Sequence, residues 1–290
     1  MLEQNNTSLQ DNNKSTLAMT PLKPMGFGEI LDTTFSLYRK NLTLFLGPVA
    51  FSVFGELALH LFTDFSDFFF SRYLLLGIGM VIFAVTFFTI GVGGIVIGTG
   101  ATYLNEDITI RSVLQHTIQR FWQLLGCLFL WSLVVGGLTV TIIGIPFAIF
   151  FAVRWGFFIG TVMLEKPVVS TPFRRSGQLV SEMWWQMFGM LLAIFLFSTL
   201  VHAIFEISIG FILILTNPGG EIDFIDILEW GLLSEPFENS APFFHAILLV
   251  IHLCVYAISF PIWIIGVTLV YFNQRIRKEG FDIEMQARDN

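Results

Sequence analysis

Four ionisable side chains fall inside long apolar stretches of the chain, where a charge is costly unless it has a partner. They are Arg154, Glu56, Glu206 and His252. At about 1.5 Å of rise per helical residue, all four lie at a similar depth, roughly 10–12 Å below the outer face of the membrane. Ionisable residues inside a membrane usually pair and mark functional sites. We therefore take these four residues as a candidate intramembrane site.

Glu56 is the partner that we expect for Arg154. The pair would be a structural tie between the first and fourth apolar segments. A guanidinium is also a planar fork that suits phosphate or carboxylate, so the site could instead hold an anion or a lipid headgroup, or be coupled to protons. The sequence leaves these alternatives open.

Histidines on the same outer side raise a weaker metal hypothesis. His202 and Glu206 are four residues apart, His245 and His252 are seven apart, and His60 lies toward the same face of the membrane. Such histidines are more often satisfied or interfacial, so we expect no metal and no cofactor. The sequence has no His-Glu-x-x-His, no Cys-x-x-Cys and no nucleophile elbow, and we expect no catalytic residues and no enzyme.

The elements that carry these side chains are expected to be membrane helices. The chain has 290 residues, of which 54% are hydrophobic and only 13% charged, whereas soluble domains carry about 25% charged residues. A spanning helix needs about 20 mostly apolar residues. Six segments qualify, and "IIGIP", with Gly144 and Pro146, breaks the longest apolar stretch into a hairpin. The spans are expected at 43–63, 73–98, 121–142, 146–164, 185–213 and 243–271.

Basic residues alternate with these spans. They precede the first span, lie in the loops after the second and fourth spans, and follow the last, whereas the loop 217–242 is acidic. Cytoplasmic loops carry an excess of Lys and Arg. We therefore expect a multi-pass protein with both termini in the cytoplasm, with a bacterial inner membrane as the location.

Three segments on the cytoplasmic side share one pattern. Residues 28–47, 109–126 and 170–189 each place apolar residues at helical spacing, then an aromatic or basic boundary, then a glycine as the next apolar run begins. We expect three amphipathic helices at the inner interface, each leading into two spans. Any helix that enters a membrane has similar features, so the repeat has a plain alternative. The expected fold class is an all-α, polytopic bundle of six transmembrane helices with three interfacial helices.

Three stretches also resemble a known family. They are "GEILDTTFSLYRKN" (28–41), "AVRWGFFIGTVMLEKP" (152–167) and "YFNQRIRKEGFDIEMQ" (271–286). They resemble the membrane-domain family that is joined to some glycerophosphodiester phosphodiesterases and that also occurs as stand-alone bacterial membrane proteins of unknown function. Hydrolysis in that family belongs to a separate soluble barrel, so the resemblance implies a membrane module without the enzyme. Asn273 departs from the acidic residue expected in such relatives, which would alter a contact of the tail.

The C-terminal segment is a second candidate site. Its charged residues are Arg275, Arg277, Lys278, Glu279 and Asp282. They mark either a helix that ends at Gly280 among lipid headgroups, or a contact for a cytoplasmic partner. Acidic residues lie among the basic ones, so nucleic-acid binding is not expected.

The expected organisation is a disordered tail (1–24), a six-span domain (25–272) and a cytoplasmic tail (273–290). Membrane lipids are expected partners, with a cytoplasmic or membrane protein as a further one. The function that we expect is a non-catalytic membrane scaffold or accessory in envelope or lipid metabolism. The alternative is a small transporter or lipid-handling protein built around an intramembrane Arg/Glu site.

Overall fold

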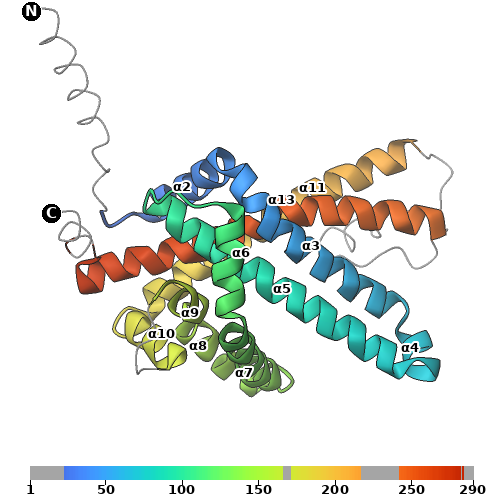
Figure 1. Cartoon of the computed structure of the whole chain (residues 1–290), viewed down its shortest axis with the longest axis horizontal. Coiled ribbons are helices and arrows are strands. Elements are labelled where there is room, and N and C mark those ends of the chain that lie inside the picture. The colour runs from blue at the N-terminus through green and yellow to red at the C-terminus, as the bar shows by residue number, and fades with distance from the viewer. Residues whose placement is uncertain (1–22, 166–170, 217–241, 282, 284–290) are drawn as a thin grey trace, which may run out of the picture.

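The computed structural model describes residues 23–165, 171–216, 242–281 and 283, and its regular structure in these ranges is entirely helical (Figure 1). Residues 1–22 of the expected disordered tail, and Asp282, lie outside these ranges. The helices are α2 (Phe27–Lys40), α3 (Leu42–Asp64), α4 (Ser66–Arg72), α5 (Leu74–Tyr103), α6 (Ile110–Gln119), α7 (Phe121–Thr139), α8 (Gly144–Arg154), α9 (Phe158–Leu164), α10 (Pro172–Val180), α11 (Trp184–Thr216) and α13 (Pro242–Glu279).

Within the described residues, six segments are long and apolar enough to cross a membrane, which confirms the expected all-α, multi-pass architecture. They are Leu42–Asp64, Leu74–Tyr103, Phe121–Thr139, Gly144–Leu164, Trp184–Ile212 and His245–Glu279. The last span differs most from the prediction, because α13 continues without a break to Glu279. The expected boundary between residues 272 and 273 therefore falls inside this helix.

The predicted hairpin between the third and fourth spans is confirmed. Helix α7 ends at Thr139 and α8 begins at Gly144. The Thr141 hydroxyl accepts a hydrogen bond from the Gly144 amide at 3.1 Å. A Cβ atom at position 144 would collide with the Leu138 carbonyl, so the turn requires glycine here.

The fourth span is interrupted, which the sequence pattern did not predict. Helix α8 ends at Arg154 and α9 begins at Phe158. The Ser176 hydroxyl of α10 fills the break, because it donates to the Arg154 carbonyl at 3.0 Å and accepts from the Phe157 amide at 3.1 Å. A side chain from a neighbouring helix thus replaces the missing helical hydrogen bonds.

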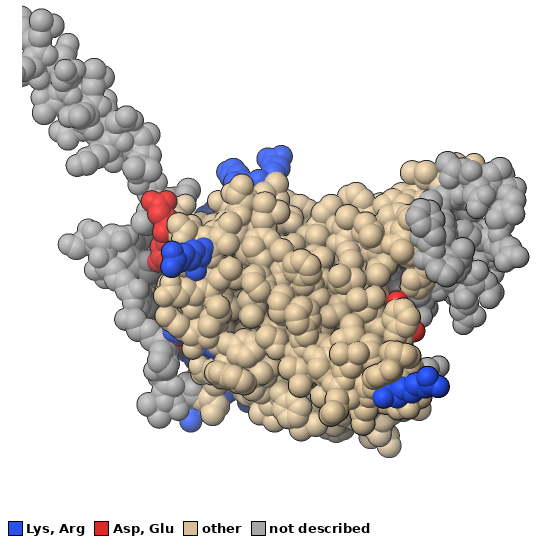
Figure 2. Space-filling model, turned by 45° about the vertical axis from the view of Figure 1, so that its right-hand side comes forward, with Lys and Arg blue, Asp and Glu red and all other residues tan. Residues whose placement is uncertain are grey.

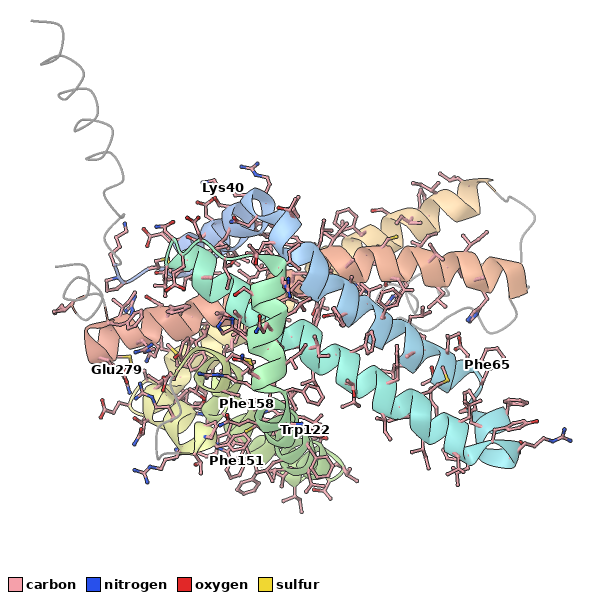
Figure 3. The ribbon with its side chains drawn as sticks, viewed as in Figure 1. Lys40, Phe65, Trp122, Phe151, Phe158 and Glu279 are labelled. Atoms are coloured by element: carbon pink, nitrogen blue, oxygen red, sulfur yellow. The ribbon has the colours of Figure 1, made fainter. Side chains whose placement is uncertain are left out.

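Each of three short helices, α2, α6 and α10, precedes two spans along the chain. Each buries one face, with Ile30 and Leu37 in α2, Val113 in α6 and Leu179 in α10 among the buried residues. Figure 3 places Glu279, at the end of α13, and Phe65, next to α4, toward opposite ends of the molecule. We call these the Glu279 end and the α4 end.

Small residues allow the spans to approach closely. The glycine spacings at 94/98 and 156/160, typical of membrane helix packing, lie at such contacts. A Cβ at Gly94 would be 2.9 Å from Pro48 of α3, and one at Gly160 would be 3.1 Å from the Tyr271 ring of α13. The surface seen in Figure 2 is largely uncharged, and charged side chains gather toward its ends. This distribution suits a molecule whose middle faces lipid.

Candidate functional site

Five ionisable side chains from three spans meet inside the bundle, and we call them the His/Glu cluster. Helix α3 contributes Glu56 and His60, α11 contributes His202 and Glu206, and α13 contributes His252. Glu56 lies eight residues before the end of α3, and His252 lies ten residues after the start of α13. At about 1.5 Å per residue, the cluster lies roughly 12–15 Å from the helix ends nearest to it. Three of the four residues of the predicted intramembrane site are therefore brought together.

His252 occupies the centre of this cluster. Its Nδ1 is 2.7 Å from Glu206 Oε1, and its Nε2 is 3.9 Å from Glu56 Oε1. Glu206 and His252 are buried, with 0% and 6% of their side chains exposed, whereas Glu56 and His60 retain 22% and 20%. The cluster is thus buried at Glu206 and His252 and partly exposed at Glu56 and His60.

Two further contacts hold the outer members of the cluster. His60 Nε2 is 3.5 Å from Glu56 Oε1, and His202 Nε2 is 3.2 Å from Glu206 Oε2. The other ring nitrogen of His202 is 2.9 Å from the hydroxyl of Ser259, which itself donates to the Val255 carbonyl. The orientation of His202 is therefore fixed from α13.

Arg154 does not join this cluster, so the predicted pair with Glu56 is wrong. Its side chain lies beside α10, where a Cβ added to Gly177 would be 3.3 Å from the guanidinium Nε. The reason is the break in the fourth span, which ends α8 at Arg154 and brings α10 against it. Arg154 is exposed, lies 5.9 Å from the Phe150 ring centre, and has no ion-pair partner among the described residues.

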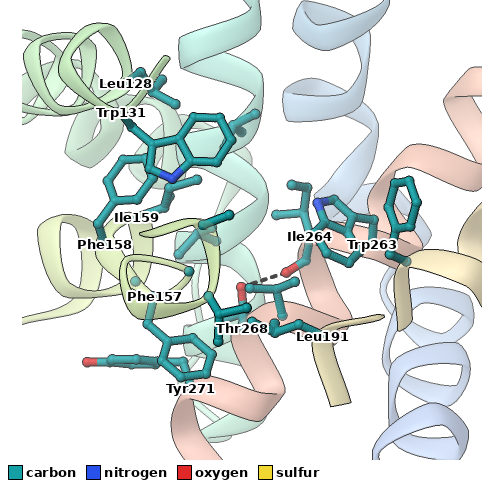
Figure 4. A pocket seen from close by; sticks show the side chains of 18 of the residues that line it. Leu128, Trp131, Phe157, Phe158, Ile159, Leu191, Trp263, Ile264, Thr268 and Tyr271 are labelled. Atoms are coloured by element: carbon teal, nitrogen blue, oxygen red, sulfur yellow. Dashed lines mark hydrogen bonds between the residues drawn. The ribbon is translucent and has the colours of Figure 1, made fainter. Parts of the chain in front are cut away.

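An apolar pocket of about 630 Å³ lies beside this break. Residues of α5, α7, α8, α9, α11 and α13 line it, and Trp131 and Trp263 face it from opposite sides (Figure 4). Ala152, Val153 and Gly156, which flank Arg154 in the chain, are part of its wall. The indole nitrogen of Trp131 is buried and has no hydrogen-bond partner within the described residues.

A polar network closes the Glu279 end of the pocket. Tyr271 lines the pocket and donates from its hydroxyl to Glu165 at 2.9 Å. Arg175 of α10 binds Glu165 at 2.9 Å and Glu279 at 2.6 Å. Burial alone would lower the pKa of the Arg175 guanidinium, but the two carboxylates outweigh it and raise that pKa above its ordinary value. Arg175 therefore remains charged and ties α10 to α13.

The predicted tail residues contact the rest of the chain. Arg277 donates to the Met25 carbonyl at 3.0 Å, and Lys278 donates to the Gln178 carbonyl at 3.2 Å. The Arg275 guanidinium lies 4.0 Å from the centre of the Phe281 ring. The helix ends at Glu279, and Gly280 has φ +62°, as expected for a helix that stops at glycine. These charged side chains make contacts within the chain, so fewer of them are available to bind a partner protein.

Sequence reasoning missed several residues of these sites. His60 and His202 were considered only as a weak metal hypothesis, although their four-residue spacing from Glu56 and Glu206 places each pair on one helix face. No pattern in the sequence indicated that Ser176, Ser259 and Trp131 take part.

No family model, curated protein or solved structure matches the chain.

Proposed function

We propose that this chain is a non-catalytic integral membrane protein of lipid metabolism that holds a membrane lipid. The pocket beside the break in the fourth span supports this proposal most directly. Its volume lies within the usual range of ligand pockets, which is about 300–1,000 Å³, and its wall is aliphatic and aromatic. Inside a bilayer, the abundant ligand that matches such a wall is an acyl chain.

Burial of an acyl chain alone would give little selectivity. Lipid tails are already in hydrocarbon, so their transfer into an apolar pocket gains little hydrophobic free energy. Polar contacts must therefore decide which lipid is held. The Trp131 N–H, which has no partner among the residues that the structure describes, offers a donor to a lipid ester carbonyl. The exposed Arg154 guanidinium offers a bidentate contact to an anionic headgroup.

The resemblance to the phosphodiesterase-associated membrane family is consistent with a role in lipid metabolism for a membrane module that does not include the catalytic barrel. The alternation of basic residues with the spans supports a bacterial inner membrane and cytoplasmic termini. The internal contacts of Arg277 and Lys278 make recruitment of a soluble partner by the tail the weaker function.

Native mass spectrometry of the purified protein in mild detergent tests the lipid proposal. We expect Ala152→Phe, which fills the pocket, to lower the amount of bound phospholipid at least severalfold. The matched control is Ala50→Phe, on an exposed position of α3. We expect Arg154→Gln to weaken the preference for anionic lipid about tenfold, which corresponds to about 1.4 kcal/mol, and Arg154→Lys and Arg72→Gln to weaken it less. Equal lipid content in Ala152→Phe and Ala50→Phe would contradict the proposal.

A further inference from the structure

We infer that the His/Glu cluster is a binding site for a divalent transition metal of the zinc class. The ligands that the geometry points to are Glu56 Oε1, His60 Nε2 and His252 Nε2. One possible ligand atom from each of these three residues lies within 4.8 Å of those of the other two. The site lies among α3, α11 and α13, and the inference does not depend on the lipid proposal.

The spacing of the three atoms is that of metal ligands. Ligands about 2.1 Å from a tetrahedral ion stand roughly 3.4 Å apart. Glu56 Oε1 is 3.5 Å from His60 Nε2 and 3.9 Å from His252 Nε2. Both separations are too long for a good hydrogen bond, and small side-chain movements would bring all three atoms onto one ion.

His252 gives an independent indication of a ligand. Its side chain is more than nine-tenths buried, and its Nε2 has no hydrogen-bond partner in the described part of the chain. Nδ1 is already bonded to Glu206 at 2.7 Å. When Nδ1 carries the proton and donates it to Glu206, Nε2 presents a bare lone pair toward Glu56 and His60, which is the arrangement of a metal-binding histidine held by a carboxylate.

The charges of the site also favour a divalent cation. The carboxylates of Glu56 and Glu206 place two negative charges inside an apolar bundle, which is unfavourable without compensation. A divalent ion bound at Glu56 contributes to that compensation. Two imidazoles and one carboxylate are the ligands of many Zn²⁺ sites with an open fourth position, and the partial exposure of Glu56 and His60 provides the entry path.

Glu206 and His202 act as positioning residues in this arrangement. Glu206 holds the ring of His252 through Oε1, and His202, fixed by Ser259, lies 3.2 Å from the other carboxylate oxygen of Glu206. A second set of three, His202, Glu206 and His252, also has its ligand atoms within 4.8 Å. We favour the Glu56 set because it uses Nε2 of His252, which has no hydrogen bond within the described ranges, and leaves the bond from Nδ1 to Glu206 intact.

Titration of the purified, chelator-treated full chain with Co²⁺ and then Zn²⁺ tests the inference. We expect a visible Co²⁺ absorption band that Zn²⁺ abolishes, and a higher melting temperature with Zn²⁺. We expect Glu56→Gln and His60→Ala to weaken binding by about 100-fold or more, and Glu206→Gln by about 10–100-fold. The control is His245→Ala, on the same helix as His252. It removes a pair with Asp64 of α3 and should leave metal binding unchanged.

Two outcomes would overturn the inference. The first is a wild-type chain that gives neither the Co²⁺ band nor a change in melting temperature with Zn²⁺, because the cluster would then be a set of ion pairs. The second is that His202→Ala abolishes binding while His60→Ala leaves it intact, because the ligands would then be the other three atoms. Size-exclusion profiles and helical circular dichroism show that each variant is folded.

Discussion

Single polar side chains fix the Glu279 end of the molecule, and Asn273, which is buried, is one of them. Its Oδ1 accepts from the Met25 amide at 2.8 Å and its Nδ2 donates to the Met25 carbonyl at 3.2 Å. The amide group therefore pairs with both backbone groups of one residue, as a strand partner would. An aspartate, one of the two acidic residues that the resemblance would imply here, could accept from the amide but could not donate to the carbonyl.

We expect Asn273→Leu to lower the free energy of unfolding by about 1–3 kcal/mol, because it leaves the Met25 amide buried and unpaired. Asn273→Asp should cost less, since it keeps the acceptor and gains an ion pair with Arg277, whose Nε is 3.4 Å from the present oxygen. Unfolding by denaturant in mixed micelles measures both. If Asn273→Leu costs no more than the exposed change Gln119→Leu, the pairing with Met25 contributes nothing.

The sequence predicted which residues could carry chemistry better than it predicted their partners. Glu56, Glu206 and His252 were expected at one depth, and they meet in the His/Glu cluster. Counting residues along each helix gives depth, but the rotation of one span against another decides which side chains touch. Apolar residues surround a membrane helix on every side, so periodicity does not reveal that rotation. The prediction for Arg154 was wrong for this reason and because the break after it was not visible.

At the scale of elements, the contact between α3 and α5 depends on glycine. A Cβ at Gly91 would be 2.8 Å from the Ser52 amide nitrogen and 2.9 Å from the Pro48 carbonyl oxygen. Both atoms belong to the backbone of α3, so the neighbour cannot move aside without moving the helix. Gly94 and Gly98 have the spacing typical of close membrane-helix packing, but the sequence did not indicate that Gly91 has the least space on α5.

We expect Gly91→Leu to separate α3 from α5 and to destabilise the protein by at least about 1–3 kcal/mol, the usual cost of overpacking. The matched control is Gly79→Leu on the same helix, where nothing lies within 4 Å of an added Cβ and the surface is exposed. Melting temperatures in one detergent compare the two variants. Equal melting temperatures would show that α3 and α5 do not need this close approach.

At the scale of the whole molecule, the six candidate spans of the described residues predict that the two ends of the helical bundle lie on one side of the membrane. The structure is consistent with this, because Arg277, near the end of α13, binds the carbonyl of Met25, which precedes α2. The first two spans meet at the opposite end, where α4 connects them. Hydropathy alone predicted the number of apolar spans among the described residues well, since it depends on the length of each apolar segment and on the hairpin at Gly144.

The orientation of this arrangement is testable with single cysteines in a chain that carries Cys127→Ser and Cys254→Ser. We expect a membrane-impermeant thiol reagent to label Arg72→Cys in intact cells, because Arg72 lies at the α4 end, which the acidic loop 217–242 predicts to be outside. Lys40→Cys, exposed at the end of α2, should be labelled only in inverted vesicles. Labelling of both positions in intact cells would rule out a six-span arrangement, since the two residues flank a single span, α3. Labelling of Lys40→Cys alone would be compatible with six spans but would reverse their orientation. The Arg175 network would then lie outside, and the anionic lipid would have to come from the outer leaflet.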